Sequence, residues 1–159
     1  MAQTLRIRTY RDGDAPALKA VFEASIRGLG RRDYTPEQVA AWIRQGPTVA
    51  AIHARCTDGR TTFVSLDRRA EIVAYIDLEM NGHLDHLYCR PEWAGTGAAA
   101  ALYDELETLA RHRNLERVFV EASEAARRFF QRRGFEVQER RSLTIQGVAM
   151  HNYAMAKPL

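Results

Sequence analysis

The segment from Cys89 to Leu106, "CRPEWAGTGAAAALYDEL", places two glycines and a run of alanines between a strand-like stretch and an amphipathic helix. A helix N-terminus leaves four backbone N–H groups unpaired and carries about half a positive charge. Gly95 and Gly97 permit unusual backbone angles, and the small side chains of Ala98–Ala100 leave the first helical turn bare. We therefore expect this segment to bind an anion through its backbone; a plain turn is the alternative.

Two familiar nucleotide-binding motifs do not fit this glycine segment. It contains no lysine or acidic metal ligand, so it is not a phosphate-binding loop of the GxxxxGK[ST] type. Only two of the three glycines of the dinucleotide-binding fingerprint could be matched. Pyrophosphate held without a metal is the interpretation that remains.

Carboxylate and imidazole side chains lie in the two strand-like segments just before the glycine segment. Asn81-Gly82 predicts a two-residue hairpin turn, which pairs Leu78 with Asp85 and Asp77 with His86. Asp85 would then lie on an apolar face, where desolvation raises the pKa of a carboxyl group towards the range useful for a general base. On the opposite face, Asp77 and His86 would form either a carboxylate–imidazole dyad or a partly exposed ion pair.

His83, His86 and Cys89 recur at every third position, as metal ligands sometimes do. Side chains of a strand point alternately to its two faces, so these three cannot converge on one ion, and we expect no metal site. Cys89 could also be an acyl-accepting nucleophile, but no basic partner is evident and a small core residue is the commoner role.

Hydrophobic periodicity predicts the elements that must position these residues. Strands are expected at 5–10, 61–66, 71–80, 83–89 and 117–122, with two or three more in the tail from 135. Helices are expected after a cap at Asp12 or Asp14, after the capping box at 35–38, from 97 to about 113 and from 123 to 133, with a short segment of the same spacing at 49–56. This order predicts an α+β fold around a mixed sheet.

The 159 residues fit one domain, 1–159, and the net charge of +3 comes almost wholly from arginine. Pairs of adjacent arginines occur at 31–32, 127–128, 132–133 and 140–141. They are scattered and form no dense stripe, which argues against a nucleic-acid partner. No apolar run is long enough to span a bilayer, and the first residues lack the apolar core of a signal peptide. With only two cysteines, the chain is expected to be cytoplasmic and reduced.

The stretches "LYCRPEWAGTGAAAAL", "VEASEAARRFFQRRGF" and "GVAMHNYAMAKPL" resemble the GNAT superfamily of acetyl-CoA-dependent N-acetyltransferases. The resemblance covers the whole chain and implies a mixed, mostly antiparallel sheet with helices on both faces. The family's core motif, Gln/Arg-x-x-Gly-x-Gly/Ala, maps onto residues 94–99. Its fourth and sixth positions fit, but Ala94 replaces the usual Gln or Arg, so one side-chain contact to the pyrophosphate is absent.

The resemblance implies acetyl-CoA as cosubstrate and assigns residues to it. The pyrophosphate would lie on the backbone around Thr96, and the pantetheine would bond to the strand edge at 87–89. The N–H of Leu87 would be the donor to the thioester oxygen, which stabilises the developing oxyanion. Ser123 caps the next helix, contacts the pantetheine, or does both. The implied cofactor-binding residues are Leu87, Tyr88, Cys89, Gly95, Thr96, Gly97, Ala98, Ala99, Ser123 and Phe130.

The resemblance also points to catalytic residues. An acidic residue just upstream of the pantetheine edge acts as base or water relay, and here that residue is Asp85; Glu121 and the His86 dyad are alternatives. Many relatives have, at the position of Phe130, a tyrosine that acts as the general acid. Phe130 has no hydroxyl. The role of acid would pass to Tyr88, Tyr153 or water. The alternatives for Arg27, Arg31, Arg32 and Tyr34, between the first two helices, are substrate contacts or a solvated loop.

The predicted function is transfer of acetyl from acetyl-CoA to a primary amine, by direct attack in a ternary complex. The acceptor would be a small molecule or a peptide, and a homodimer is compatible with the fold. Two alternatives remain at this point. The chain could be a coenzyme A-binding sensor that lost the chemistry, which Ala94 and Phe130 favour, or a GNAT toxin that acetylates aminoacyl-tRNA.

Overall fold

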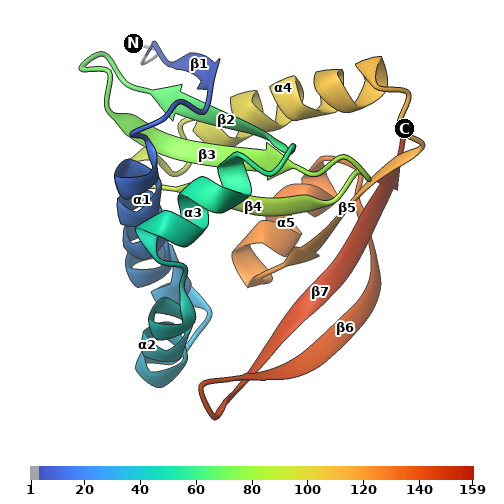
Figure 1. Cartoon of the computed structure of the whole chain (residues 1–159). Helices are drawn as coiled ribbons and strands as arrows, with labels where there is room; N and C mark the ends of the chain where they lie inside the picture. Colours follow the sequence, from blue (N-terminus) through green and yellow to red (C-terminus); the bar gives the residue numbers. More distant parts are fainter. Residues whose placement is uncertain (1–3) are drawn as a thin grey trace.

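A computed structural model of the chain describes residues 4–159 (Figure 1). The strands are β1 (Arg6–Thr9), β2 (Thr61–Leu66), β3 (Ile72–Leu78), β4 (Leu84–Cys89), β5 (Arg117–Ala122), β6 (Glu136–Ile145) and β7 (Val148–Pro158). The α-helices are α1 (Ala15–Leu29), α2 (Pro36–Gln45), α3 (Val49–Cys56), α4 (Ala98–His112) and α5 (Glu124–Arg132), and the 3-10 turns are η1 (Gly30–Arg32) and η2 (Pro91–Trp93). The predicted order of elements is confirmed, and residues 49–56 form a third helix.

The strands form two antiparallel sheets, in the orders β1-β2-β3-β4 and β5-β7-β6. A parallel bridge between His83 and Phe119 joins them, where the Phe119 N–H donates to the Gly82 carbonyl at 3.1 Å. A side chain at position 82 would bring its Cβ within 2.5 Å of the Arg117 carbonyl oxygen, so this close approach of β4 to β5 requires glycine. Beyond the bridge β4 pairs only with β3, which leaves its other edge open.

The two faces of the first sheet pack against different helices. Alternate residues of β3, such as Ile76, lie in a core shared with α4, α5 and β5. Tyr75 lies on the other face, in a core with Leu18 of α1 and Ile52 of α3. Helices on both faces of a mixed, mostly antiparallel arrangement confirm the predicted fold class.

The structure contains most of the helix caps that the sequence predicted. Thr35 and Gln38 form the predicted capping box, and the Ser123 hydroxyl accepts from the Ala126 N–H at 3.4 Å. Asp14 directly precedes α1, but its side chain does not cap the helix. Its carboxylate instead binds Arg8 at 2.7 and 3.1 Å, because the strand before the helix brings that guanidinium within reach.

The β3–β4 hairpin differs from the prediction by one residue. The Glu79 N–H donates to the His83 carbonyl at 2.8 Å, and the Gly82 N–H donates to the Glu79 carbonyl at 3.1 Å. Only Gly82 in this turn has a positive φ, so the loop spans residues 80–82 and carries a glycine bulge rather than the two-residue turn we expected. Leu78 therefore lies opposite Leu84, not Asp85.

A second irregularity follows between Ile76 and Leu78, because Ile76 pairs with Leu87. Two residues of β4, Asp85 and His86, therefore stand opposite the single residue Asp77, as in a β-bulge. The bulge turns the Asp85 side chain to the same face as Asp77. The predicted apolar environment for Asp85 was wrong for this reason.

Candidate active site

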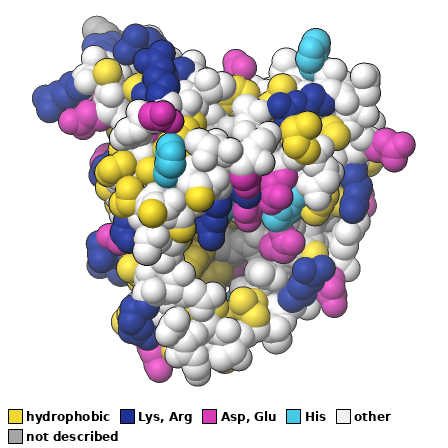
Figure 2. Space-filling view, in the orientation of Figure 1, with side chains coloured by type: hydrophobic (Ala, Val, Ile, Leu, Met, Phe, Trp, Pro, Cys, Tyr) yellow, Lys and Arg dark blue, Asp and Glu magenta, His cyan; other side chains and the backbone are white. Residues whose placement is uncertain are grey.

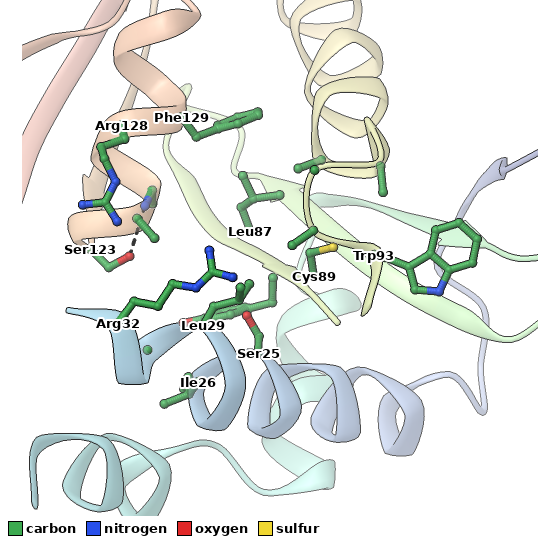
Figure 3. A pocket seen from close by; sticks show the side chains of 18 of the residues that line it. Ser25, Ile26, Leu29, Arg32, Leu87, Cys89, Trp93, Ser123, Arg128 and Phe129 are labelled. Carbon is green, nitrogen blue, oxygen red and sulfur yellow. Dashed lines mark hydrogen bonds between the residues drawn. The ribbon is translucent and has the colours of Figure 1, made fainter. Parts of the chain in front are cut away.

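A cleft of about 470 Å³ opens between α1, the free edge of β4, the start of α4 and helix α5 (Figure 3). Leu87 and Cys89 line its floor, and Phe129 projects into it from α5. Most of the residues that we expected to bind a cofactor line this one cleft: Leu87, Tyr88, Cys89, Gly95, Gly97, Ala98, Ala99 and Ser123. Thr96 does not line it, and its exposed side chain donates to the Trp93 carbonyl at 2.6 Å.

The start of α4 leaves its backbone donors uncovered. Gly97 precedes the helix in the left-handed conformation, with φ 89°, and has no capping side chain. A Cβ added at Gly95 or Gly97 would meet nothing within 4 Å, so both glycines border open space. The N–H groups of the first helical turn have no intrahelical partner. The end of the cleft at α4 can therefore bind an anion through the backbone.

The free edge of β4 presents a second set of backbone donors. The Arg90 N–H donates to the Val73 carbonyl at 2.9 Å, and the His86 N–H donates to Asp77 at 2.7 Å, so both point towards β3. Because successive N–H groups of a strand alternate in direction, those of Leu87 and Cys89 point to the open edge. An extended ligand could pair with this edge as an added strand.

Helix α5 presents Phe129 to the cleft, and not Phe130. Phe130 is 1% exposed and packs against Tyr103 and Phe135 in the main core. Consecutive helical residues differ by about 100° in direction, so the two phenylalanines cannot both face the cleft. The assignment of Phe130 as a cofactor contact is corrected to Phe129.

Four arginines also line the cleft: Arg32, which the sequence offered as a substrate contact or part of a solvated loop, and Arg128, Arg132 and Arg133, which we did not assign from the sequence. Arg128 is bonded to Asp33 at 2.8 Å, and Arg133 to Asp104 at 2.8 Å. Arg128 and Arg132 are four residues apart in α5, and this spacing on one helical face was the available sequence signal. These side chains make one wall of the cleft basic.

A buried guanidinium lies among the carboxylates at the β-bulge. Arg60 Nη1 donates to Asp77 at 3.0 Å and to Asp85 at 2.9 Å, and Arg60 also contacts Asp58. The side chains of Arg60 and Asp77 are only 7% and 3% exposed. Desolvation raises the pKa of Asp85, but the neighbouring His86 and Arg60 lower it by more, so the net shift is downward. The raised pKa that we predicted for Asp85 was therefore wrong.

His86 and Asp77 form the predicted carboxylate–imidazole pair, with His86 Nδ1 2.7 Å from Asp77 Oδ2. The other ring nitrogen, Nε2, lies 3.2 Å from Arg55 Nη1. Arginine can only donate, so Nε2 must be the acceptor and Nδ1 carries the proton. This arrangement orients the His86 ring between Asp77 and Arg55.

Comparison with known proteins agrees with this geometry. A family model described as an acetyltransferase (GNAT) domain matches residues 31–157. The chain belongs to the GNAT acetyltransferase family. It is therefore an acyltransferase of the N-acetyltransferase type.

Three relatives illustrate the range of similarity. The uncharacterized N-acetyltransferase YafP of Escherichia coli is 25% identical over 95% of this chain and 94% of its own. A GCN5-related N-acetyltransferase from Rhodopseudomonas palustris is 32% identical, with a TM-score of 0.90, full coverage of this chain and 99% of that one. A phosphinothricin acetyltransferase from Sinorhizobium meliloti, solved with AcCoA, shares the fold at TM-score 0.75 and 21% identity, over 100% of this chain and 89% of that one.

Tyr153 of this acetyltransferase lies in a different polar network. Its hydroxyl donates to Glu124 Oε1 at 2.6 Å, and His151 contacts the same oxygen at 2.6 Å. Burial raises the pKa of Glu124, but bonds from Tyr153, His151 and Arg127 bring it down to about 2. Tyr153 does not line the cleft, and its proton is already engaged by a carboxylate.

The remaining candidates also have partners in this GNAT structure. Glu121 is bonded to His83 at 2.5 Å, which also binds Glu79 at 2.8 Å. Cys89 packs in the main core, where burial raises the pKa of its thiol to about 11, so it remains a neutral thiol.

None of the helices in residues 4–159 combines the length and the apolar character that a membrane span requires.

Proposed function

We propose that this GNAT protein transfers the acetyl group of acetyl-CoA to a primary amine of a small molecule or peptide, by direct attack in a ternary complex. The observation that carries the proposal is the single cleft that joins the open edge of β4 to the uncovered start of α4. A strand edge suits an extended pantetheine arm, and a bare helix N-terminus suits a pyrophosphate.

The backbone would perform most of the donor recognition. The N–H groups at Ala98 and Ala99 would hold the pyrophosphate, and Arg132 adds a cation beside them. The missing side-chain contact at Ala94 would be compensated by this basic wall. The outward N–H of Leu87 would donate to the thioester oxygen and stabilise the oxyanion that forms when the amine attacks.

The amine would approach from the face shown in Figure 2, where Asp, Glu and His side chains gather beside a hollow between α1, α2 and β7. Negative charge on this rim would attract a cationic amine. The Asp85 side chain is 30% exposed, and its lowered pKa keeps it ionised at neutral pH. It would accept the amine's proton through a water molecule, with His86 Nδ1 3.6 Å from its Oδ2.

The test has two stages. Calorimetry with acetyl-CoA should give binding in the micromolar range, and no binding at millimolar acetyl-CoA would overturn the proposal. A thiol-release screen over amines, polyamines, aminoglycosides and peptide N-termini should then find an acceptor. Binding without release over the whole screen would favour the sensor alternative, and a salt-sensitive shift of aminoacyl-tRNA would favour the toxin.

The role of Asp85 is tested by Asp85→Asn, with Asp58→Asn as a matched control that also loses a contact to Arg60 but is not placed at the bulge. We expect Asp85→Asn to lower kcat by about 10²-fold or more, the usual contribution of a positioned base, with Asp58→Asn close to wild type. Full kcat in Asp85→Asn between pH 6 and 9 would remove Asp85 from the mechanism.

A further inference from the structure

The coenzyme A thiolate that leaves in the proposed reaction needs a proton. The structure shows which residues could supply it. This inference rests on the proposed function. Phe130, at the position where the resemblance implies a tyrosine general acid, has no hydroxyl and lies in the core. Tyr153 directs its proton at Glu124. Any protein-derived acid must therefore come from another residue that lines the cleft.

Tyr34 meets the geometric requirements. It follows η1, lines the cleft and is 7% exposed. Its hydroxyl oxygen accepts the Glu124 N–H, the first of helix α5, at 3.1 Å. Within the described part of the chain no group accepts the hydroxyl's own proton. Figure 3 shows Arg32, two residues before Tyr34, at the same end of the cleft as Ser123.

The surroundings of Tyr34 fix its side chain. Its ring packs edge-on to Trp42 at 5.5 Å, and the preceding residue, Asp33, is bonded to Arg128 of α5. The loop after α1 is thus bonded to α5 at two points, Glu124 and Arg128. The charged or titratable groups near the Tyr34 side chain are Asp33, Glu124, Arg128, His151 and Tyr153. Tyr34 cannot swing freely, so its hydroxyl is held at one place on the cleft wall.

We propose that Tyr34 is the general acid that protonates the leaving thiolate. As the amine nitrogen forms its bond to the acetyl carbon, the carbon–sulfur bond breaks, and its electron pair leaves on sulfur. Sulfur takes the phenolic proton of Tyr34, and the proton lost by the amine leaves on the Asp85 side. The Glu124 N–H and the positive end of α5 stabilise the transient phenolate, which regains a proton from water.

Tyr88 is the competing residue because it also lines the cleft. Its ring lies 5.0 Å from Phe22 and 5.7 Å from Tyr75, and the Trp42 side chain is hydrogen-bonded to its hydroxyl oxygen. Burial and nearby carboxylates raise the pKa of both tyrosines, with Asp85 and Asp77 beside Tyr88 and Glu124 and Asp33 beside Tyr34, so the local hydrogen-bond donors distinguish them. Tyr34 has a backbone donor and a helix N-terminus at its oxygen, and Tyr88 has neither.

The test uses Tyr34→Phe, Tyr88→Phe and Tyr153→Phe, which keep the aromatic rings and remove one hydroxyl each. Tyr153→Phe is the matched control, because it also removes a bond to Glu124 but lies outside the cleft. Calorimetry compares coenzyme A with desulfo-coenzyme A, which lacks the sulfur. Only Tyr34→Phe should lose the preference for coenzyme A, by about 3- to 10-fold, the usual worth of one hydrogen bond.

Kinetics supply the second readout, with the amine found in the screen or with water as acceptor. Tyr34→Phe should lower thiol release from acetyl-CoA by about 10- to 100-fold, at the lower end for an acid because the thiolate leaves readily. The defect should shrink with an acetyl thioester of a more acidic thiol. Circular dichroism and a thermal melt establish that each variant is folded.

The outcomes separate this inference from the proposed function. If wild type releases coenzyme A and Tyr34→Phe matches it in both rate and sulfur preference, Tyr34 is not the acid, although the enzyme is still an acetyltransferase. If Tyr88→Phe alone shows the losses, the role belongs to Tyr88. If Tyr34→Phe is slow with every thioester alike, its hydroxyl only supports the start of α5. Wild-type protein that fails to bind acetyl-CoA overturns the proposed function instead.

Discussion

Arg60→Met removes the guanidinium that neutralises the carboxylates at the β-bulge. In the native protein Arg60 is 3.0 Å from Asp77 and 2.9 Å from Asp85, with its side chain 7% exposed. Methionine keeps the apolar stem of the side chain but leaves Asp77, itself 3% exposed, without its arginine partner. Breaking a buried pair in this way costs about 3–5 kcal/mol of unfolding free energy at pH 7.

The loss of unfolding free energy in Arg60→Met should depend on pH, and the direction of this dependence follows from the lowered pKa of Asp85. A carboxyl group with a folded pKa below its unfolded value stabilises the protein above the unfolded pKa, near 3.8, and this contribution disappears as pH falls through the folded pKa. Without Arg60 the pKa of Asp85 is no longer lowered by the guanidinium, so Asp85 is protonated at higher pH and the negative charge at the bulge is reduced. The difference between wild type and Arg60→Met should therefore narrow between pH 7 and pH 4.

Urea denaturation followed by circular dichroism at both pH values measures the loss of unfolding free energy. In a thermal melt at pH 7 the melting temperature should fall by roughly 6–20 °C, since a domain of this size loses about 2–4 °C per kcal/mol. Arg141→Met is the control, because its pair with Glu139 is exposed and worth less than about 1 kcal/mol. A loss in Arg60→Met below 1 kcal/mol at pH 7, or an equal loss at pH 4, would refute the reasoning.

Three further predictions concern the approach of β4 to β5 and the cleft. Gly82→Ala should cost about 2–4 kcal/mol in urea denaturation, because its Cβ meets a β5 carbonyl; Gly59→Ala, also at positive φ but in open space, should cost only about 1–2 kcal/mol, and equal losses would contradict the clash. Ala94→Gln should strengthen coenzyme A binding by about 3- to 10-fold in calorimetry by adding the absent contact, and unchanged affinity would contradict it. Arg132→Met should weaken that binding about tenfold at low salt and reduce its salt dependence, whereas the exposed Arg31→Met should do neither; the reverse pattern would place the phosphates elsewhere.

Several features followed from the sequence because they depend on neighbouring residues. The capping box at Thr35, the cap at Ser123 and the left-handed Gly97 are set by backbone sterics and hydrogen bonds within a few positions. The order of strands and helices followed from hydrophobic periodicity for the same reason. The glycine segment was also recognised as a place where the backbone itself could bind an anion.

Other features depend on packing between distant segments. A one-residue difference in the hairpin loop and the bulge at Asp85 moved that carboxylate to the other face of β4, beside Arg60 from the start of β2. Period-2 alternation cannot reveal such a shift, since every side chain after it changes face. The direction of the pKa shift reversed as a result.

The sequence by itself determined the fold class and most of the backbone groups that line the cleft, because these depend on composition and local spacing. Only the tertiary structure decided which side chains meet at the cleft. It put Phe130 in the core, gave Tyr153 to Glu124 and brought Tyr34 from another element to the start of α5. Contacts between elements far apart in the chain form where packed surfaces fit, and no short stretch of residues encodes that fit.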